Sequence, residues 1–447
     1  MHRIMKIRWL YFFLLTLMGA ALTAQDPDTV LTLSLQEAQE YAVQHNKMVK
    51  ASRYEVQAAE MSKWEVISNG LPRVDASGSL NDNLKLMTTL LPGEIIGQPG
   101  EMIPVQFGTK YNTGYGLQAT QMIFNAPYFV GIQTMKLAEQ MSQQSLERSE
   151  IDIREQVINT YYLILISRES LDILNGTSEN LREVYRSTKS MKEVGMAEET
   201  DVDQMLSNVR GLETNVRSME RNLEFSYNLL RFQLGVNINT DINLTTNLDE
   251  LLKETSIEVL MESDFNIREH IDFRLTESQV KMQELTLKNE KASILPSLSA
   301  FYSWNKNGMG NKLNDMRWFP NSMLGFQVSV PIFASGQRYS RIKRAQIDLE
   351  IAVTNRNLLS DQLLLQEKQL RFNLINARDQ YDTQLENVDV AYRVYESIEN
   401  KYRQGLASSL DLTQANNNYL QAENNYISAV MDLLQTKLAL DKLLNNI

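Results

Sequence analysis

The chain has 447 residues, 43% of them hydrophobic, and carries 44 basic against 55 acidic side chains, a net charge of −11. This charge argues against a nucleic-acid partner, and the absence of cysteine excludes disulfides, thiolate metal sites and cysteine nucleophiles. We expect neither an enzyme nor a cofactor, because His45 and His270 have no metal-ligand spacing and the sequence contains no nucleophile motif or phosphate-binding loop.

The N-terminus has the pattern of an export signal. Arg3, Lys6 and Arg8 precede an apolar run over 9–22, and small residues end at Ala24, after which we expect cleavage. No run of about 18 apolar residues follows, so no helix is predicted to cross a membrane. An exported chain of this kind can cross a membrane only as strands.

Residues 25–235 form the first half of the expected architecture. A helical pattern from Leu31 ends before Gly70, and alternating strands are predicted at about 71–86 and 107–124, joined by a polar loop with three prolines. One side of these strands is apolar and rich in tyrosine, and the other is small and polar. Helices are predicted at about 128–194 and 198–234, with a turn at Gly195.

Residues 236–266 lose periodicity, and we interpret them as an irregular segment with one short helix near 248–253. The second half, 267–447, repeats the order of the first. It has a helix over 267–294 and strands at about 296–304 and 322–333, joined by a loop with Gly308, Gly310 and Pro320. Helices at about 335–404 and 408–445 follow, with a turn at Gly405.

The last two helices carry apolar residues at every seventh position, typical of helices that wind around neighbours as a coiled coil. These positions are Leu374, Tyr381, Val388, Tyr395 and Tyr402 before the turn, and Tyr419, Tyr426, Leu433 and Leu440 after it. At a rise of about 1.5 Å per residue the helix over 335–404 would be about 100 Å long. Taken alone, this pattern is also typical of a structural coiled coil.

The two halves of the sequence align in separate blocks, each without gaps. Leu71-Pro72 matches Leu295-Pro296 at an offset of 224 residues, whereas Ile123-Phe124 matches Ile332-Phe333 at 209. The difference of 15 residues falls between the paired strands, so the first half has the longer strand connection. Past the strands the offset stays near 210, and Gly195, Ala197 and Asp201 match Gly405, Ala407 and Asp411.

Four strands cannot close a membrane barrel, since the smallest single-chain barrels have about eight and an open edge in lipid leaves backbone groups unpaired. If the strands enter a membrane, several copies must share one barrel. Their aromatic residues resemble the aromatic belt at a membrane interface: Tyr111, Tyr115, Tyr302, Trp304 and Phe326. For a single strand, this pattern is more typical of an ordinary half-buried sheet; four such strands flanked by very long helices on an exported chain favour the barrel.

The order of elements and the paired turns, Val194 to Ala197 and Gln404 to Ala407, resemble the TolC-type outer-membrane efflux proteins. The resemblance covers essentially the whole exported chain. It implies a mixed fold in which a homotrimer shares a twelve-stranded β-barrel in the outer membrane of a Gram-negative bacterium and a long α-helical coiled-coil barrel spans the periplasm. It also implies a passive tunnel for efflux or type I secretion, with outer-membrane lipid, a periplasmic adaptor and an inner-membrane pump as partners.

The resemblance also suggests roles for individual residues. The two turns would form the periplasmic tip, where an adaptor docks on Gly195, Met196, Ala197, Gly405, Leu406 and Ala407. Asp411 would face the constriction, Asp201 is its match in the first half, and Tyr402 would help to hold the tip closed. The chain departs from the family at Gln414, where some members have a second Asp, and at Ala407, where the family's latch has an Arg. Both aspartates are also explained as carboxylates that stabilise a helix N-terminus.

The alternative class is an exported coiled-coil stalk without transport activity. Recovery in the outer-membrane fraction and heat-modifiable mobility would favour the channel, and a soluble periplasmic rod would favour the stalk.

Overall fold

The computed structural model describes residues 30–92, 97, 100, 102–253 and 257–447, so the predicted export signal, 1–24, lies outside the described residues. The chain forms two compact units. The first contains the chain up to Lys50, Glu150–Ser263 and Gln369–Ile447, and the second contains Ala51–Ser149 and Asp264–Lys368. In the described part of the chain, no helix is long and apolar enough to cross a membrane.

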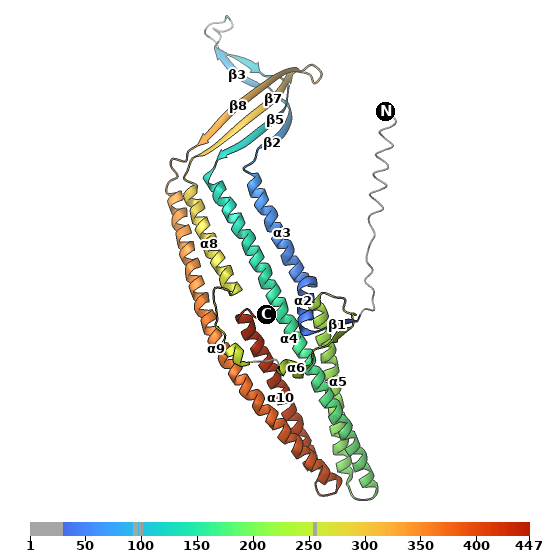
Figure 1. The fold of residues 1–447 in the computed structure, drawn as a ribbon. Helices are drawn as coiled ribbons and strands as arrows, with labels where there is room; N and C mark the ends of the chain where they lie inside the picture. Colours follow the sequence, from blue (N-terminus) through green and yellow to red (C-terminus); the bar gives the residue numbers. More distant parts are fainter. Residues whose placement is uncertain (1–29, 93–96, 98–99, 101, 254–256) are drawn as a thin grey trace, which may run out of the picture. The chain divides into compact units, whose positions relative to one another are not determined.

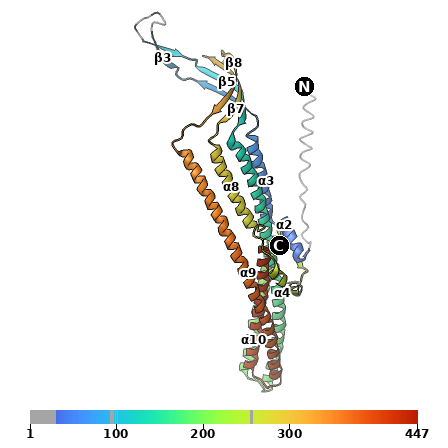
Figure 2. The ribbon, with the colours of Figure 1, turned by 60° about the vertical axis from the view of Figure 1, so that its left-hand side comes forward.

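The second unit is built on a four-stranded antiparallel sheet in the order β2-β5-β7-β8. These strands are β2 (Arg73–Asp82), β5 (Tyr111–Phe124), β7 (Ser297–Gly310) and β8 (Arg317–Ser329). The helices that continue from them lie in the matching order, and Figures 1 and 2 show α3, α4, α8 and α9 side by side in this unit. Their bounds are α3 (Lys47–Ser68), α4 (Ala126–Glu193), α8 (Ile271–Ala292) and α9 (Gln337–Arg403).

Side chains on facing surfaces join these helices in pairs. The Lys63 ammonium of α3 lies 2.6 Å from the Glu139 carboxylate of α4, and Ser278 of α8 donates to Gln144 of α4 over 2.9 Å. Polar contacts therefore hold α3 and α8 on the two sides of α4.

The sheet has one apolar and one polar face, because its register places like residues opposite each other. Leu117 pairs with Trp304, and Ala300 pairs with Phe326. The aromatic rings of Tyr115 and Trp304 meet at 6.0 Å, and Trp318 lies 5.5 Å from Tyr115. This apolar face is exposed in the single chain; among its residues Leu324 is 70% and Phe326 69% accessible.

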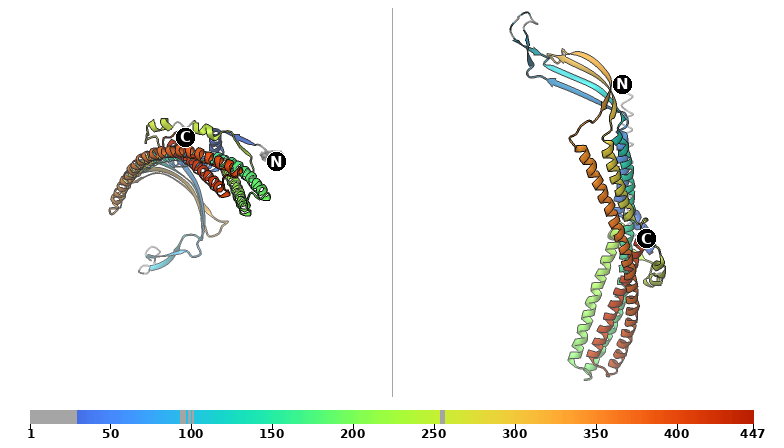
Figure 3. Two further views of the ribbon diagram at one scale, coloured as in Figure 1. Left: turned by 90° about the horizontal axis from the view of Figure 1, so that it is seen from below. Right: turned by 90° about the vertical axis from the view of Figure 1, so that its left-hand side faces the viewer.

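The polar face is crowded in a way that only glycine permits. A Cβ atom on Gly116 would lie 2.1 Å from the Asn305 amide oxygen, and one on Gly325 would lie 2.6 Å from the ring of Phe301. These glycines let neighbouring side chains lie across them. Figure 3 shows that the four strands form a curved sheet.

The predicted strand connections were wrong in two places. Gly308, Gly310 and Pro320 belong to strands rather than to a loop, so β7 extends to Gly310 and β8 begins at Arg317 and ends at Ser329, four residues before the predicted end. Gly308 lies against the ring of Trp318, and Pro320 is tolerated because β8 is an edge strand.

The proline-rich connection of the first half is not simply a loop. It contains a second antiparallel pair, β3 (Met87–Pro92) and β4 (Met102–Phe107), with Thr89 opposite Val105. Pro104 fits because a two-stranded ribbon consists of edge strands alone. Pro99 lies outside the described residues.

In the first unit, five short elements of the described chain lie beside the long helices. They are β1 (Leu31–Leu33), α2 (Leu35–His45), β6 (Ile242–Leu244), α6 (Leu248–Lys253) and α7 (Ile257–Glu262). Helix α7 packs against α9 and α10 (Ser409–Leu443). The Tyr161 hydroxyl of α4 donates to the Leu33 carbonyl over 3.2 Å and accepts from the Thr246 amide over 3.1 Å, which ties the parallel pair β1–β6 to α4. The segment 236–266 is thus more regular than predicted: besides the predicted helix it contains β6 and α7.

A helix break at Asn46 was also missed. The Asn46 side chain accepts from the Met48 amide over 2.7 Å and donates to the Gln233 carbonyl over 2.7 Å, so it ends α2, begins α3 and holds both to α5 (Glu199–Leu234). Asparagine caps helices in this way.

The seventh-position residues of α9 and α10 (Ser409–Leu443) form a packed seam. Leu374, Tyr395, Leu433 and Leu440 are buried, and the rings of Tyr395 and Tyr419 stack at 5.7 Å. The Arg371 guanidinium of α9 donates to three carbonyls at the end of α7, at 2.5 to 2.9 Å, where the helix dipole favours a cation.

Candidate functional site

The two predicted turns end α4 and α9 with the same backbone geometry. Gly195 and Gly405 have φ of +77° and +74°, a conformation that side-chain-bearing residues rarely adopt. The Met196 amide donates to the Met191 carbonyl, and the Leu406 amide donates to the Lys401 carbonyl, each over 2.8 Å. These bonds are those of a Schellman C-cap, so each glycine both ends a helix and aims the residue after it outward.

The residues after the glycines differ in exposure. Met196 is 75% and Leu406 73% accessible, whereas Ala197 and Ala407 are half-buried. Ala407 packs against an apolar cluster that contains Tyr402 and Leu412. Each turn therefore exposes a large apolar side chain after its glycine, and the first turn also exposes Val194, which is 70% accessible. In Figures 1 and 2 the α4–α5 and α9–α10 turns lie next to each other.

Asp201 and Asp411 cap the helices that leave these turns. The Asp201 carboxylate accepts from the Glu198 amide over 3.0 Å, and the Asp411 carboxylate accepts from the Ser408 amide over 3.0 Å and from its hydroxyl over 2.7 Å. The two hydrogen bonds from Ser408 lower the pKa of Asp411, and the bond from the hydroxyl has the larger effect. The carboxylate of Asp411 is consequently ionised at neutral pH.

One hydrogen bond joins the two turns directly. The Ser409 hydroxyl at the start of α10 donates to Asp201 on α5 over 2.5 Å. Two turns further along α5 and one turn further along α10, the Asn208 amide donates to the Thr413 hydroxyl over 2.9 Å. Asp201 is thus half-buried and engaged between helices, whereas Asp411 is exposed. The two matched aspartates therefore have different surroundings.

Tyr402 lies in the apolar cluster at the centre of this four-helix end, together with Val184, Met205 and Leu412. Its hydroxyl lies 2.7 Å from the Thr188 hydroxyl, which itself donates to the Val184 carbonyl, so Tyr402 is the donor of the pair. Burial raises the pKa of Tyr402. Within one copy Tyr402 therefore ties α9 to α4.

Gln414 belongs to a polar row that runs along α10. Steps of three and four residues, which follow one face of a helix, connect exposed side chains that we call the α10 polar stripe. It consists of Asp411, Gln414, Asn418, Gln421, Asn425, Ser428, Asp432 and Gln435. Gln414 donates to Asn418 over 2.8 Å and Gln421 to Asn425 over 2.9 Å. No basic residue occurs between Arg403 and Lys437, so carboxylates, amides and the Ser428 hydroxyl give this face its polarity.

The same row recurs on α5 at an offset of 210 residues. This α5 polar stripe consists of Asp201, Gln204, Asn208, Gly211, Asn215, Ser218 and Asn222. Gln204 donates to Asn208 over 3.1 Å, as Gln414 does to Asn418. The stripes were missed in the sequence, although their spacing and offset are visible there, because uncharged amides are common on any exposed helix. Among the described residues, no group of three His, Cys, Asp or Glu could hold a metal ion.

Comparison with known proteins identifies one family. The family model described as "Outer membrane efflux protein" matches residues 39–236 and 270–446. The toluene efflux pump outer membrane protein TtgC of Pseudomonas putida is 24% identical over 289 residues, 62% of this chain and 57% of that protein. The antibiotic efflux pump outer membrane protein ArpC of Pseudomonas putida is 24% identical over 292 residues, with the same coverage. The match thus spans little more than half the length of these curated relatives.

Solved structures show the fold. The CusC structure superposes with a TM-score of 0.72 at 15% identity and covers 92% of this chain and 91% of that one. The Campylobacter jejuni CmeC outer membrane channel gives 0.70 at 19% identity, covering 92% and 85%. The open state of the Neisseria gonorrhoeae MtrE outer membrane channel gives 0.71 at 14% identity, covering 92% and 88%. The predicted combination of long helices and a four-stranded sheet is therefore confirmed.

Proposed function

This chain belongs to the outer membrane efflux protein family, and from that premise we propose that three copies form a passive conduit from an inner-membrane pump through the periplasm and the outer membrane. The family consists of transport proteins rather than enzymes. Each copy would contribute four strands to a shared twelve-stranded barrel, and its helices would continue the barrel as a tunnel. The tunnel would serve efflux or type I secretion.

In the second unit, the sheet and the layer of helices end at the same two edges, and this observation supports the proposal most directly. The sheet ends in β2 and β8, which follow α3 and precede α9 in the chain. Both helices expose apolar side chains: Tyr54, Met61 and Trp64 on α3, and Ile351, Leu358 and Leu365 on α9, each 52% to 66% accessible. The α9 residues recur every seventh position, as in a coiled-coil seam.

The α3–β2 edge and the α9–β8 edge are two different surfaces, as a head-to-tail ring of copies requires. An α3–β2 edge of one copy would cover the α9–β8 edge of the next, and a ring leaves neither strand edges nor apolar seams exposed. Strand pairing across the edges would satisfy the backbone groups that lipid cannot. The exposed apolar face of the sheet would then contact outer-membrane lipid.

We propose the two turns as the docking site for a periplasmic adaptor. Charged replacements, Met196→Asp together with Leu406→Asp, are expected to abolish adaptor crosslinking and export, because both side chains are exposed and apolar and neither packs in the core. The neighbouring exposed Glu199→Gln serves as the control and should leave both unchanged. Docking at the turns is ruled out if the double variant crosslinks and exports like the wild type.

We further propose that Asp411 faces the constriction, where three copies would form a ring of carboxylates. In single-channel recordings Asp411→Asn should weaken divalent-cation block about tenfold, since the variant removes three converging charges. Asp203→Asn, which removes an exposed charge outside the polar stripes, should not change the block. Equal block in wild type and Asp411→Asn would remove Asp411 from the gate. With Gln414 in place of a second Asp, divalent binding should be weaker than in members with two acidic rings.

A further inference from the structure

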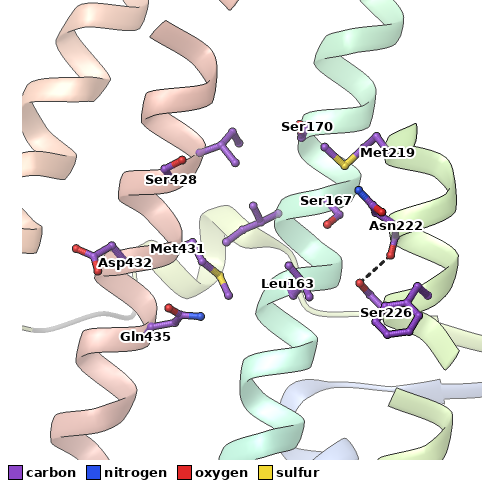
Figure 4. Close-up of a pocket in the computed structure, with 13 residues that line it drawn as sticks. Leu163, Ser167, Ser170, Met219, Asn222, Ser226, Ser428, Met431, Asp432 and Gln435 are labelled. Carbon is purple, nitrogen blue, oxygen red and sulfur yellow. Dashed lines mark hydrogen bonds between the residues drawn. The ribbon is translucent and has the colours of Figure 1, made fainter. Parts of the chain in front are cut away.

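A pocket of about 650 Å³ lies between α4, α5 and α10, where the two polar stripes end. Figure 4 shows Met219, Met431 and Leu163 beside this space and the Asp432 carboxylate directed away from them. Among the described lining residues, Asp432 is the one charged side chain. The pocket therefore offers a molecule only apolar and uncharged polar groups, which do not select one class of ligand.

The end of the sheet away from the helices, in contrast, carries an excess of positive charge. Among the described residues there, five are basic, against the acidic Asp82 and Asp315. The basic residues are Lys85, Lys110, Lys306, Lys312 and Arg317. None of them has a carboxylate partner in the described part of the chain, and the ion pair Arg73–Asp75 lies at the opposite end of the sheet. This excess occurs in a chain with 55 acidic and 44 basic residues, so it is local.

Aromatic rings hold two of these cations in place. Register places Lys306 of β7 opposite Tyr115 of β5, on the apolar face of the sheet. The Lys306 ammonium lies 5.8 Å from the centre of the Trp318 ring, and the Lys110 ammonium lies 5.2 Å from that of Tyr111. A ring attracts an ammonium group without neutralising its charge. Both cations are therefore positioned and still able to bind an anion.

The place of Lys306 along β7 gives its depth in a bilayer. Lys306 is nine residues beyond Ser297, the first residue of β7, which follows α8. Nine residues of a strand tilted by about 40° rise about 23 Å, close to the apolar band of about 25 Å in membrane barrels. Over this distance the apolar face of β7 carries Leu298, Ala300, Tyr302 and Trp304. With the sheet in the outer membrane, Lys306 would be level with the headgroups of the outer leaflet.

We propose that this end of the sheet binds an outer-leaflet lipid whose sugar headgroup carries phosphate groups, as in lipopolysaccharide. Lysine and arginine bind phosphate, and clusters of them bind anionic headgroups. Several cations, rather than one, favour a headgroup with two phosphates over a phospholipid with one. The acyl chains would lie along the apolar face, between the headgroup and the helices. This inference rests on the proposed function, because that function places the sheet in the outer membrane.

The test is native mass spectrometry of the purified full-length protein in detergent micelles, titrated with diphosphoryl lipid A. We expect saturable binding, weaker binding of phosphatidylglycerol, and no displacement of lipid A by inorganic phosphate. Lys306→Gln should weaken lipid A binding about fivefold, and Lys306→Gln with Lys110→Gln about 25-fold, as expected for basic groups at an anionic lipid surface. Lys281→Gln removes the same charge from α8 and should bind lipid A like the wild type.

Four results would overturn the site: no binding of lipid A, equal affinity in wild type and the double variant, equal binding of phosphatidylglycerol, or displacement by inorganic phosphate. All the residues of the site belong to one copy, so binding does not require the ring. Conductance of the same preparation therefore separates the two proposals. A conducting protein that binds no lipid A loses the site and keeps the channel, whereas binding without conductance keeps the site and loses the channel.

Discussion

Replacing Leu358 and Leu365 together by glutamate should convert the assembled protein into single copies. Both side chains lie on the exposed seam of α9, which the proposed ring would bury against α3 of the next copy. Burial of one leucine contributes about 1.5 to 3 kcal/mol, and the variant loses this twice at every interface and adds two charges that the apolar seam cannot pair. Native mass spectrometry of the purified protein measures the outcome.

The matched control is Gln366→Glu, which places one new charge beside Leu365 on an exposed polar position of the same helix. It should keep the mass of the wild-type assembly. An unchanged mass for Leu358→Glu/Leu365→Glu would mean that the α9 seam is not an interface, and the ring would then have to close through other surfaces.

The second large effect is expected on the apolar face of the sheet. Phe326→Arg places a charge where we propose lipid, at a cost of about 2 to 4 kcal/mol for each copy near the bilayer centre. The variant should therefore be lost from the outer-membrane fraction or become sensitive to external protease. Cell fractionation with quantitative blotting measures this effect.

Gln327→Arg provides the comparison within the same strand. Gln327 pairs with Ser299 and lies on the polar face, whereas Phe326 pairs with Ala300 and lies on the apolar face. A charge on the polar face should be tolerated, because it would face water in the lumen. If the two variants fractionate alike, the assignment of the two faces is wrong.

The long elements could be predicted from the sequence because their signals are local and repeated. The seventh-position residues of α9 and α10 and the glycines at 195 and 405 fix helices and turns through contacts between near neighbours in the chain. The internal repeat added a second, independent instance of each element. Alternation within the strands likewise predicted the two faces of the sheet.

The short elements could not be predicted in this way. Three-residue strands such as β1 and β6 have too few positions for a pattern, and their pairing joins Leu31 to Ile242 far along the chain. The break at Asn46 depends on its bond to the Gln233 carbonyl, a tertiary contact. The β7 and β8 bounds were wrong because glycine and proline usually signal a loop, whereas here Gly308 accommodates Trp318 and Pro320 lies on an edge strand.

In the candidate site, too, features with a local sequence signal could be predicted, and features that depend on tertiary contacts could not. Exposure of Met196 and Leu406 follows from the turn chemistry, but the different surroundings of Asp201 and Asp411 depend on Ser409, which joins one half of the repeat to the other. The pocket at the ends of the polar stripes depends on three helices meeting, and no single stretch of sequence indicates it.

Electrical recording from the purified wild-type protein in planar lipid bilayers, with the particle mass measured on the same sample, tests the proposed conduit most directly. We expect a particle of three copies that produces discrete conductance steps of uniform size. A water-soluble particle of one copy that gives no steps would contradict it.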